Sequence, residues 1–121
     1  IAADLSDETR RNQLVREISE GAGPLHCLVN NASLFEPDSG LDFEPALARS
    51  QLEVNLIAPL TLARDLARQM AAQPAPEDAS VIHVLDQKVF NLNPDYFSYS
   101  ISKLALERAV SLQAQGEQLP C

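Results

Sequence analysis

Two short apolar segments, each followed directly by polar residues, alternate with long stretches of helical periodicity. This alternation constrains the fold more than any other feature. The apolar segments cover residues 25–29 and 80–85, and the helical patterns run from Ser6 until Gly21 stops the first of them, then over about 44–72 and 97–115. Ser6 is a suitable N-cap for the first helix, and Pro59 should bend the second. Strands that alternate with helices of this length predict an α/β fold with a parallel sheet covered on both faces.

The composition limits the classes of partner and environment. The chain has 121 residues, 45% of them apolar, and a net charge of −8, which suits one domain with a packed core. The acidic balance argues against nucleic acid and anionic membrane surfaces as partners. No apolar run approaches the roughly 20 residues of a membrane-spanning helix. The cysteines, Cys27 and Cys121, form no disulfide framework, so we expect a cytoplasmic protein.

The third helical stretch carries a residue pair that suits proton transfer. Tyr99 and Lys103 are four positions apart and share one helix face. An ammonium beside a phenol lowers the phenol pKa, so Tyr99 is a candidate proton donor and acceptor near neutral pH. An ordinary amphipathic helix is the alternative. In parallel sheets ligands bind at the carboxyl ends of the strands, which here means residues 30–33 and Asp86 onward.

Several polar residues occur in an order that matches a known enzyme family. Asn30, Asn31 and Ala32 end the first apolar segment, Asn55 lies in the next helix, and a polar residue stands thirteen positions before Tyr99. This pattern resembles the short-chain dehydrogenase/reductase family over residues 1 to about 115. The resemblance implies a doubly wound, Rossmann-like sheet, here a single partial domain over residues 1–121.

The same resemblance implies roles for these residues. Asn31 and Ala32 would shape the cofactor pocket, Asn55 would hold a proton-relay water, and Tyr99 and Lys103 would carry out the chemistry. Lys103 would also bind the nicotinamide ribose. Asp4 and Leu5 resemble the family's adenine-contacting segment, although Asp4 is equally suited to capping the first helix.

Two departures from the common family pattern resemble the branch of pteridine and dihydromonapterin reductases. Ser33 replaces the usual glycine, and Asp86 stands where most members carry a catalytic serine. In that branch Phe35 would stack on a pterin against the nicotinamide, Tyr96 would line the substrate pocket, and Asp86 would help to protonate the ring. A carboxylic acid with a raised pKa is a suitable donor for C=N reduction. The alternatives are an Asx turn at Asp86 and a Phe35 that plugs the core edge.

The resemblance leads to an NADPH-dependent reductase of a pterin-like small molecule, with the choice of NADPH resting on resemblance alone. The Gly-rich turn that holds a pyrophosphate is not found, so we expect an internal segment of a longer reductase that is marginal on its own. The helices at 44–72 and 97–115 resemble those that pair between subunits, which predicts a homo-oligomer. No metal is expected, because His26, Cys27 and His83 lack ligand spacing.

Two other functions stay open from the sequence. One is a carbonyl or alcohol oxidoreductase of the same family. The other is a non-catalytic, truncated member that acts as an interaction module.

Overall fold

The computed structural model describes residues 1–73, 79–86 and 91–117. Helix α1 (Glu8–Ala22) is followed by strand β1 (Cys27–Asn30), and helix α2 (Pro45–Leu52) continues through a π-helical turn η1 (Glu53–Ile57) into helix α3 (Ala58–Ala71). Strand β2 (Ser80–His83) and helix α4 (Phe97–Glu117) complete the order. The strands pair in parallel, as predicted, with Leu28 opposite Val81.

Local chemistry explains where the first helix begins and ends. The side chain of Asp7, rather than that of Ser6, caps α1 by accepting a hydrogen bond from the Arg10 amide at 3.1 Å. The Ser6 hydroxyl instead donates to Asp4 at 2.7 Å, so the predicted N-cap lies one residue too early. Gly23 ends the helix with φ 92°, a left-handed conformation that suits glycine.

The core lies between the sheet and α3. One stripe of α3 is buried and packs against inward-facing side chains of the strands, which gives a cluster of Ala63, Leu66, Met70, Ala79 and Val81. Ala63, Leu66 and Met70 recur at three- and four-residue intervals along α3, as expected for the buried face of a helix. The buried Arg11 guanidinium bonds Glu53 at 2.7 Å and so joins α1 to η1.

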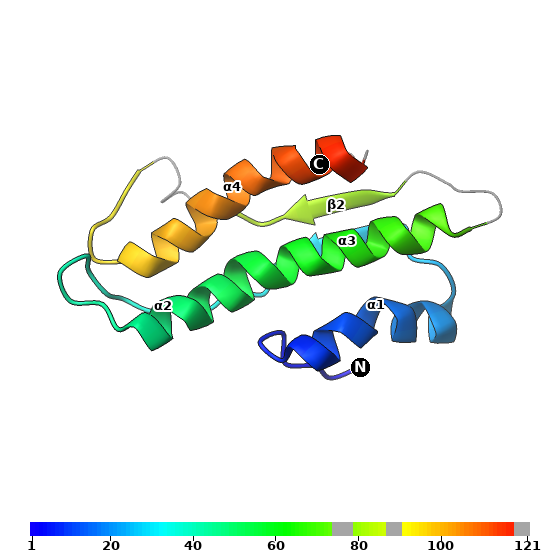
Figure 1. The fold of residues 1–121 in the computed structure, drawn as a ribbon, viewed down its shortest axis with the longest axis horizontal. Coiled ribbons are helices and arrows are strands. Elements are labelled where there is room, and N and C mark those ends of the chain that lie inside the picture. The colour runs from blue at the N-terminus through cyan, green and yellow to red at the C-terminus, as the bar shows by residue number, and fades with distance from the viewer. Residues whose placement is uncertain (74–78, 87–90, 118–121) are drawn as a thin grey trace.

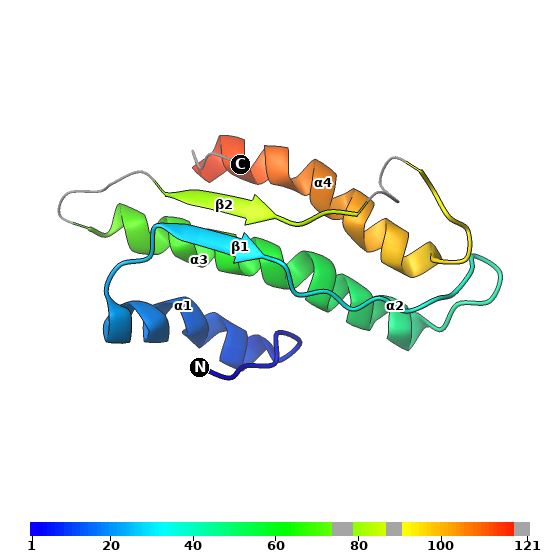
Figure 2. The same ribbon diagram turned by 180° about the vertical axis from the view of Figure 1, so that it is seen from behind.

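The described helices leave one face of the sheet bare. Helix α3 packs against one face, with α1 and α4 on either side of it (Figure 1), and no helix lies in front of the strands when the molecule is seen from behind (Figure 2). On that open face Val29 and Ile82 are paired neighbours, 56% and 52% exposed. The α/β class with a parallel, Rossmann-like sheet is therefore confirmed, whereas the described residues form only one of the two predicted helical layers.

Pro59 affects the helix on its N-terminal side. The Ala58 amide bonds the Glu53 carbonyl, five residues back, which is the π-helical pattern. Proline has no N–H, so the Asn55 carbonyl lacks the donor that an α-helix supplies four residues later. The irregularity expected at Pro59 is thus a π-helical turn centred on Asn55. No helix in the described parts of the chain is long and apolar enough to cross a membrane.

Candidate active site

Tyr99 and Asp86 meet at the carboxyl ends of the two strands. Both strands point the same way, so the residues that follow them come together at one edge of the sheet. The Tyr99 hydroxyl, in the first turn of α4, donates a hydrogen bond to Asp86 Oδ2 at 3.0 Å. Tyr99 is 4% exposed. The structure therefore joins two predicted site residues that lie thirteen positions apart in sequence.

The pKa of Tyr99 differs from the expectation. Burial of the phenol, together with the hydrogen bond and the charge of Asp86, raises its pKa to about 12, while a hydrogen bond from Ser33 acts in the opposite direction. The expected lowering by Lys103 is therefore wrong for this structure, because desolvation and the neighbouring carboxylate both favour the neutral phenol. At neutral pH Tyr99 holds its proton.

Lys103 lies on the same face of α4 as Tyr99, but its ammonium group has another partner. Its side chain is buried, and Nζ donates to the Val84 carbonyl at 3.0 Å. Burial lowers the pKa of Lys103, and the Asp86 carboxylate partly opposes this shift. The lysine thus reaches the chain just after β2 and adds a positive charge beside the Tyr99 and Asp86 pair.

An aromatic cluster borders the Tyr99 ring. Phe35 stacks on Tyr96 with ring centroids 4.5 Å apart and an interplanar angle of 6°, and it meets Tyr99 edge to face at 4.6 Å. Phe35 remains 48% exposed. The predicted substrate residues thus lie against the predicted proton donor, and an exposed aromatic surface is available to a planar ring.

Asn55 has a structural role that was not predicted. Its side chain is fully buried, with Oδ1 accepting from the Leu34 amide and Nδ2 donating to the Leu34 carbonyl, both at 2.8 Å. Nδ2 also lies 3.1 Å from the Ser102 hydroxyl. The side-chain amide is thus bonded to protein partners on both of its polar atoms.

The predicted cofactor residues fall into two groups. Asn31, Ala32 and Ser33 follow β1 directly and are exposed at the edge where Tyr99 lies. Asp4 and Leu5 form the segment that precedes α1. Asp4 accepts from the Ser6 amide at 2.9 Å, outside the helix, so it does not cap α1.

Three buried or half-buried residues near the site were missed by the sequence analysis. Gln51 is fully buried, four residues before Asn55, and donates to the Ser98 hydroxyl at 2.5 Å. Asp38 accepts from the Ser98 amide at 2.9 Å and also from the Ser98 hydroxyl. The four-residue spacing of Gln51 and Asn55 was the available signal, because it places both amides on one helix face.

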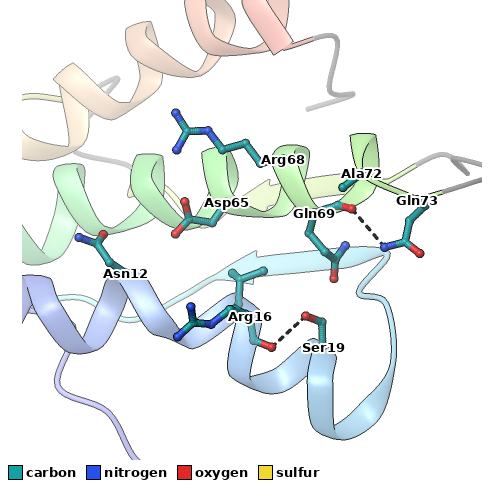
Figure 3. A pocket seen from close by; sticks show the side chains of 9 residues that line it. Asn12, Arg16, Ser19, Asp65, Arg68, Gln69, Ala72 and Gln73 are labelled. Atoms are coloured by element: carbon teal, nitrogen blue, oxygen red, sulfur yellow. Dashed lines mark hydrogen bonds between the residues drawn. The ribbon is translucent and has the colours of Figure 1, made fainter.

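Neither the histidine on β2 nor the hollow between α1 and α3 adds a second candidate active site. His83 Nδ1 lies 3.2 Å from Asn30 Nδ2, and burial with the nearby Lys103 charge lowers the His83 pKa. Among the described residues, no cluster of histidine, cysteine or carboxylate side chains has the geometry to hold a metal ion. A hollow of about 360 Å³ between α1 and α3, seen in Figure 3, is bordered by Arg16, Asp65 and Arg68 and contains no predicted site residue.

The comparisons with known proteins agree with this geometry. The model of the short chain dehydrogenase family matches residues 1–117. FolM alternative dihydrofolate reductase 1 from Brucella canis, solved with NADP, is 38% identical with a TM-score of 0.87. Its counterpart from Brucella suis, also solved with NADP, is 39% identical with a TM-score of 0.86.

These alignments cover 97% and 96% of this chain, which spans only 46% and 47% of the two FolM chains. A gluconate 5-dehydrogenase from Burkholderia cenocepacia, at 21% identity and TM-score 0.84, shares the fold over 94% of this chain and 44% of its own. No protein of curated function matches. With the family model matching nearly the whole chain and the site at the expected strand ends, the protein belongs to the short-chain dehydrogenase family.

Proposed function

We propose that the protein carries the substrate and proton-transfer site of an NADPH-dependent reductase that acts on a dihydropterin. The observation that carries this proposal is the Tyr99 to Asp86 hydrogen bond, 3.0 Å long, with Phe35 against the same tyrosine ring. A serine at position 86 would suit ketones, whereas a carboxyl group also serves the nitrogen of a C=N bond. The similarity to two dihydrofolate reductases solved with NADP supports both the substrate class and the cofactor.

Each residue of the site has its own role in the proposed reduction. Tyr99 gives a proton to the substrate, since its raised pKa keeps the phenol protonated at neutral pH. Asp86 accepts the hydrogen bond of that phenol and is the nearest carboxyl group able to exchange a proton with it. Phe35, half exposed, offers its ring to the flat substrate, and Tyr96 supports that ring from one side.

The exposed residues that follow β1 are suited to the nicotinamide part of a cofactor. Asn31 to Ser33 are exposed beside Tyr99, and the buried Lys103 holds a positive charge at the same edge. A bound NADPH supplies the hydride. We propose that Asn31, Ala32 and Ser33 line its pocket, that Lys103 bonds its ribose, and that Asp4 and Leu5 lie near its adenine.

A substrate comparison tests this function. NADPH oxidation by the natural protein is followed with a dihydropterin, with dihydrofolate and with simple ketones, using Tyr99→Phe as the control. We expect turnover of the pterin compounds and its loss in the variant. Turnover of ketones alone would replace the proposal with the carbonyl reductase alternative, and no NADPH oxidation with any of them would favour a non-catalytic role.

We also propose that subunits pair through the helices at 44–72 and 97–115. Large aliphatic side chains are exposed on these helices, namely Ile57 at 41%, Ile101 at 42% and Leu112 at 72%. Exposed apolar side chains of this size favour burial against another surface. A cytoplasmic location, with no nucleic acid or membrane partner, is part of the same proposal, and light scattering of the natural protein tests the assembly.

A further inference from the structure

The segment that carries Phe35 is held in place at every second residue. The Leu34 amide and carbonyl bond the Asn55 side chain, and the Glu36 amide bonds Gln51 Oε1 at 3.2 Å. The third contact is Asp38, whose amide donates to the Asp95 carbonyl at 2.9 Å. These bonds hold the main chain on both sides of Phe35, whose ring contacts Tyr96 and Tyr99.

Asp38 connects this segment to the start of α4. Its carboxylate accepts from both the amide and the hydroxyl of Ser98, and its carbonyl accepts from the Phe97 amide at 3.3 Å. Asp38 also forms an isolated parallel bridge with Tyr96. Tyr96 and Tyr99 stand on either side of Ser98 in the chain, so one carboxylate fixes the backbone from which both rings project.

The Ser98 hydroxyl is the point at which three elements meet. It donates to Asp38 and accepts from Gln51 Nε2 at 2.5 Å, and both Ser98 and Gln51 are buried. A buried hydroxyl with a donor on one side and an acceptor on the other has a single favourable arrangement. The link runs from α2 through Ser98 to the segment that carries Phe35.

We propose that Asp38 is a positioning residue, which sets the distance between the Phe35 ring and the Tyr99 hydroxyl through Ser98 and thereby tunes binding of the planar substrate. This inference rests on the proposed function, because it assigns Phe35 to the substrate ring. Asp38 itself need not touch the substrate. Its contribution is to hold the aromatic surface and the proton donor in one fixed relation before the substrate arrives.

The variant Asp38→Asn tests the proposal in the natural protein. The carboxylate of Asp38 accepts from Ser98 with both oxygens, and an asparagine of nearly the same size keeps only one of them, so either the amide or the hydroxyl of Ser98 loses its acceptor. We expect the KM for a dihydropterin to rise about tenfold or more, with the KM for NADPH changed less than about twofold. Asp42→Asn, the same charge change at an exposed position of the same segment, is the matched control.

Two further variants distinguish a positioning role of Asp38 from a general loss of folded structure. Ser98→Ala is the gentler variant, since it keeps the amide that bonds Asp38. If both residues act through one link, the double variant Asp38→Asn with Ser98→Ala has a KM close to that of either single variant. If the double variant is folded and its KM rises by the product of the two single increases, the proposal is overturned. An unchanged KM for the dihydropterin in folded Asp38→Asn would also overturn it.

A spectroscopic measurement keeps this inference independent of the proposed substrate. The chain has no tryptophan, and its only tyrosines are Tyr96 and Tyr99, both in contact with Phe35. In the natural protein, we expect Asp38→Asn to weaken the tyrosine near-UV circular dichroism relative to Asp42→Asn, with the far-UV signal retained. Absence of pterin turnover in the unmodified protein would contradict the proposed function alone, whereas an unchanged near-UV signal would contradict the role of Asp38.

Discussion

The Tyr99 hydroxyl donates to Asp86 Oδ2 at 3.0 Å, so two titratable groups lie side by side at the carboxyl edge of the sheet. They come from different elements: Tyr99 stands on α4, and Asp86 follows β2. Burial of Tyr99 strengthens the contact, because the local dielectric is lower than that of water. In the proposed reductase, proton delivery would therefore depend on both side chains.

Tyr99→Phe should remove the proton donor and leave the ring packing intact. We expect kcat for dihydropterin reduction by the natural protein to fall by about 10² to 10⁴-fold, the usual contribution of a positioned acid. Affinity for NADPH, measured by fluorescence titration, should change little, because the phenyl ring still packs against Phe35. Near-normal turnover in this variant would show that another group supplies the proton.

Asp86→Ser should alter substrate preference. The variant removes the carboxylate that raises the pKa of Tyr99, so the pKa moves back toward its ordinary value although burial still raises it. We expect loss of pterin turnover and improved turnover of ketones, compared by kcat/KM for the two substrate classes. Unchanged pterin turnover would remove Asp86 from the proposed proton path.

The pKa of Tyr99 also predicts how stability depends on pH. The folded protein holds the phenol proton more tightly than the unfolded chain, because the pKa is about 12 when folded against an ordinary value of 10.0. Its contribution to stability is therefore complete below pH 10 and is lost as the pH rises toward 12. In urea unfolding between pH 9 and 12, we expect the difference between the unmodified protein and Tyr99→Phe to shrink by at most about 3 kcal/mol. A difference that stays constant would contradict the raised pKa.

Asn55→Ala should be strongly destabilising. The variant leaves the Leu34 amide and carbonyl without their side-chain partners, and an unpaired polar group in a protein interior costs about 1–3 kcal/mol. We expect the free energy of unfolding to fall by about 2–4 kcal/mol in chemical denaturation. Asn12→Ala, at an exposed position of α1, is the control and should change it by less than about 0.5 kcal/mol. Equal losses in the two variants would contradict the structural role of Asn55.

Periodicity was sufficient to predict the elements and the parallel pairing of the strands. The two apolar segments became β1 and β2, and the third helix begins at the predicted Phe97. Cap chemistry was less decisive, since Asp4, Ser6 and Asp7 are all suitable capping residues and only the folded geometry selects Asp7. The π-helical turn could not be predicted either, because a proline near Asn55 is compatible with a kink as well as with a turn of this kind.

Only the part of the site that belongs to the sequence motif could be predicted. Tyr99, Asp86, Phe35 and Tyr96 come together as the motif implies. The direction of the Tyr99 pKa shift was not predictable, because burial of the phenol and the path of the Lys103 side chain depend on tertiary packing. The bonds of Asp38 to Ser98 span sixty positions, and no local pattern encodes such a contact.

The π-helical turn restricts how the length of this helix can vary during evolution. A turn closed by a bond five residues back holds one residue more than an α-helical turn and takes it up locally. A single deletion within η1 would therefore give regular α-helix and leave Gln51 in phase with the buried stripe that includes Leu66. Elsewhere in this helix a single deletion would rotate one side against the other by about 100°, so homologues should differ in length by one residue at this turn rather than in α2 or α3.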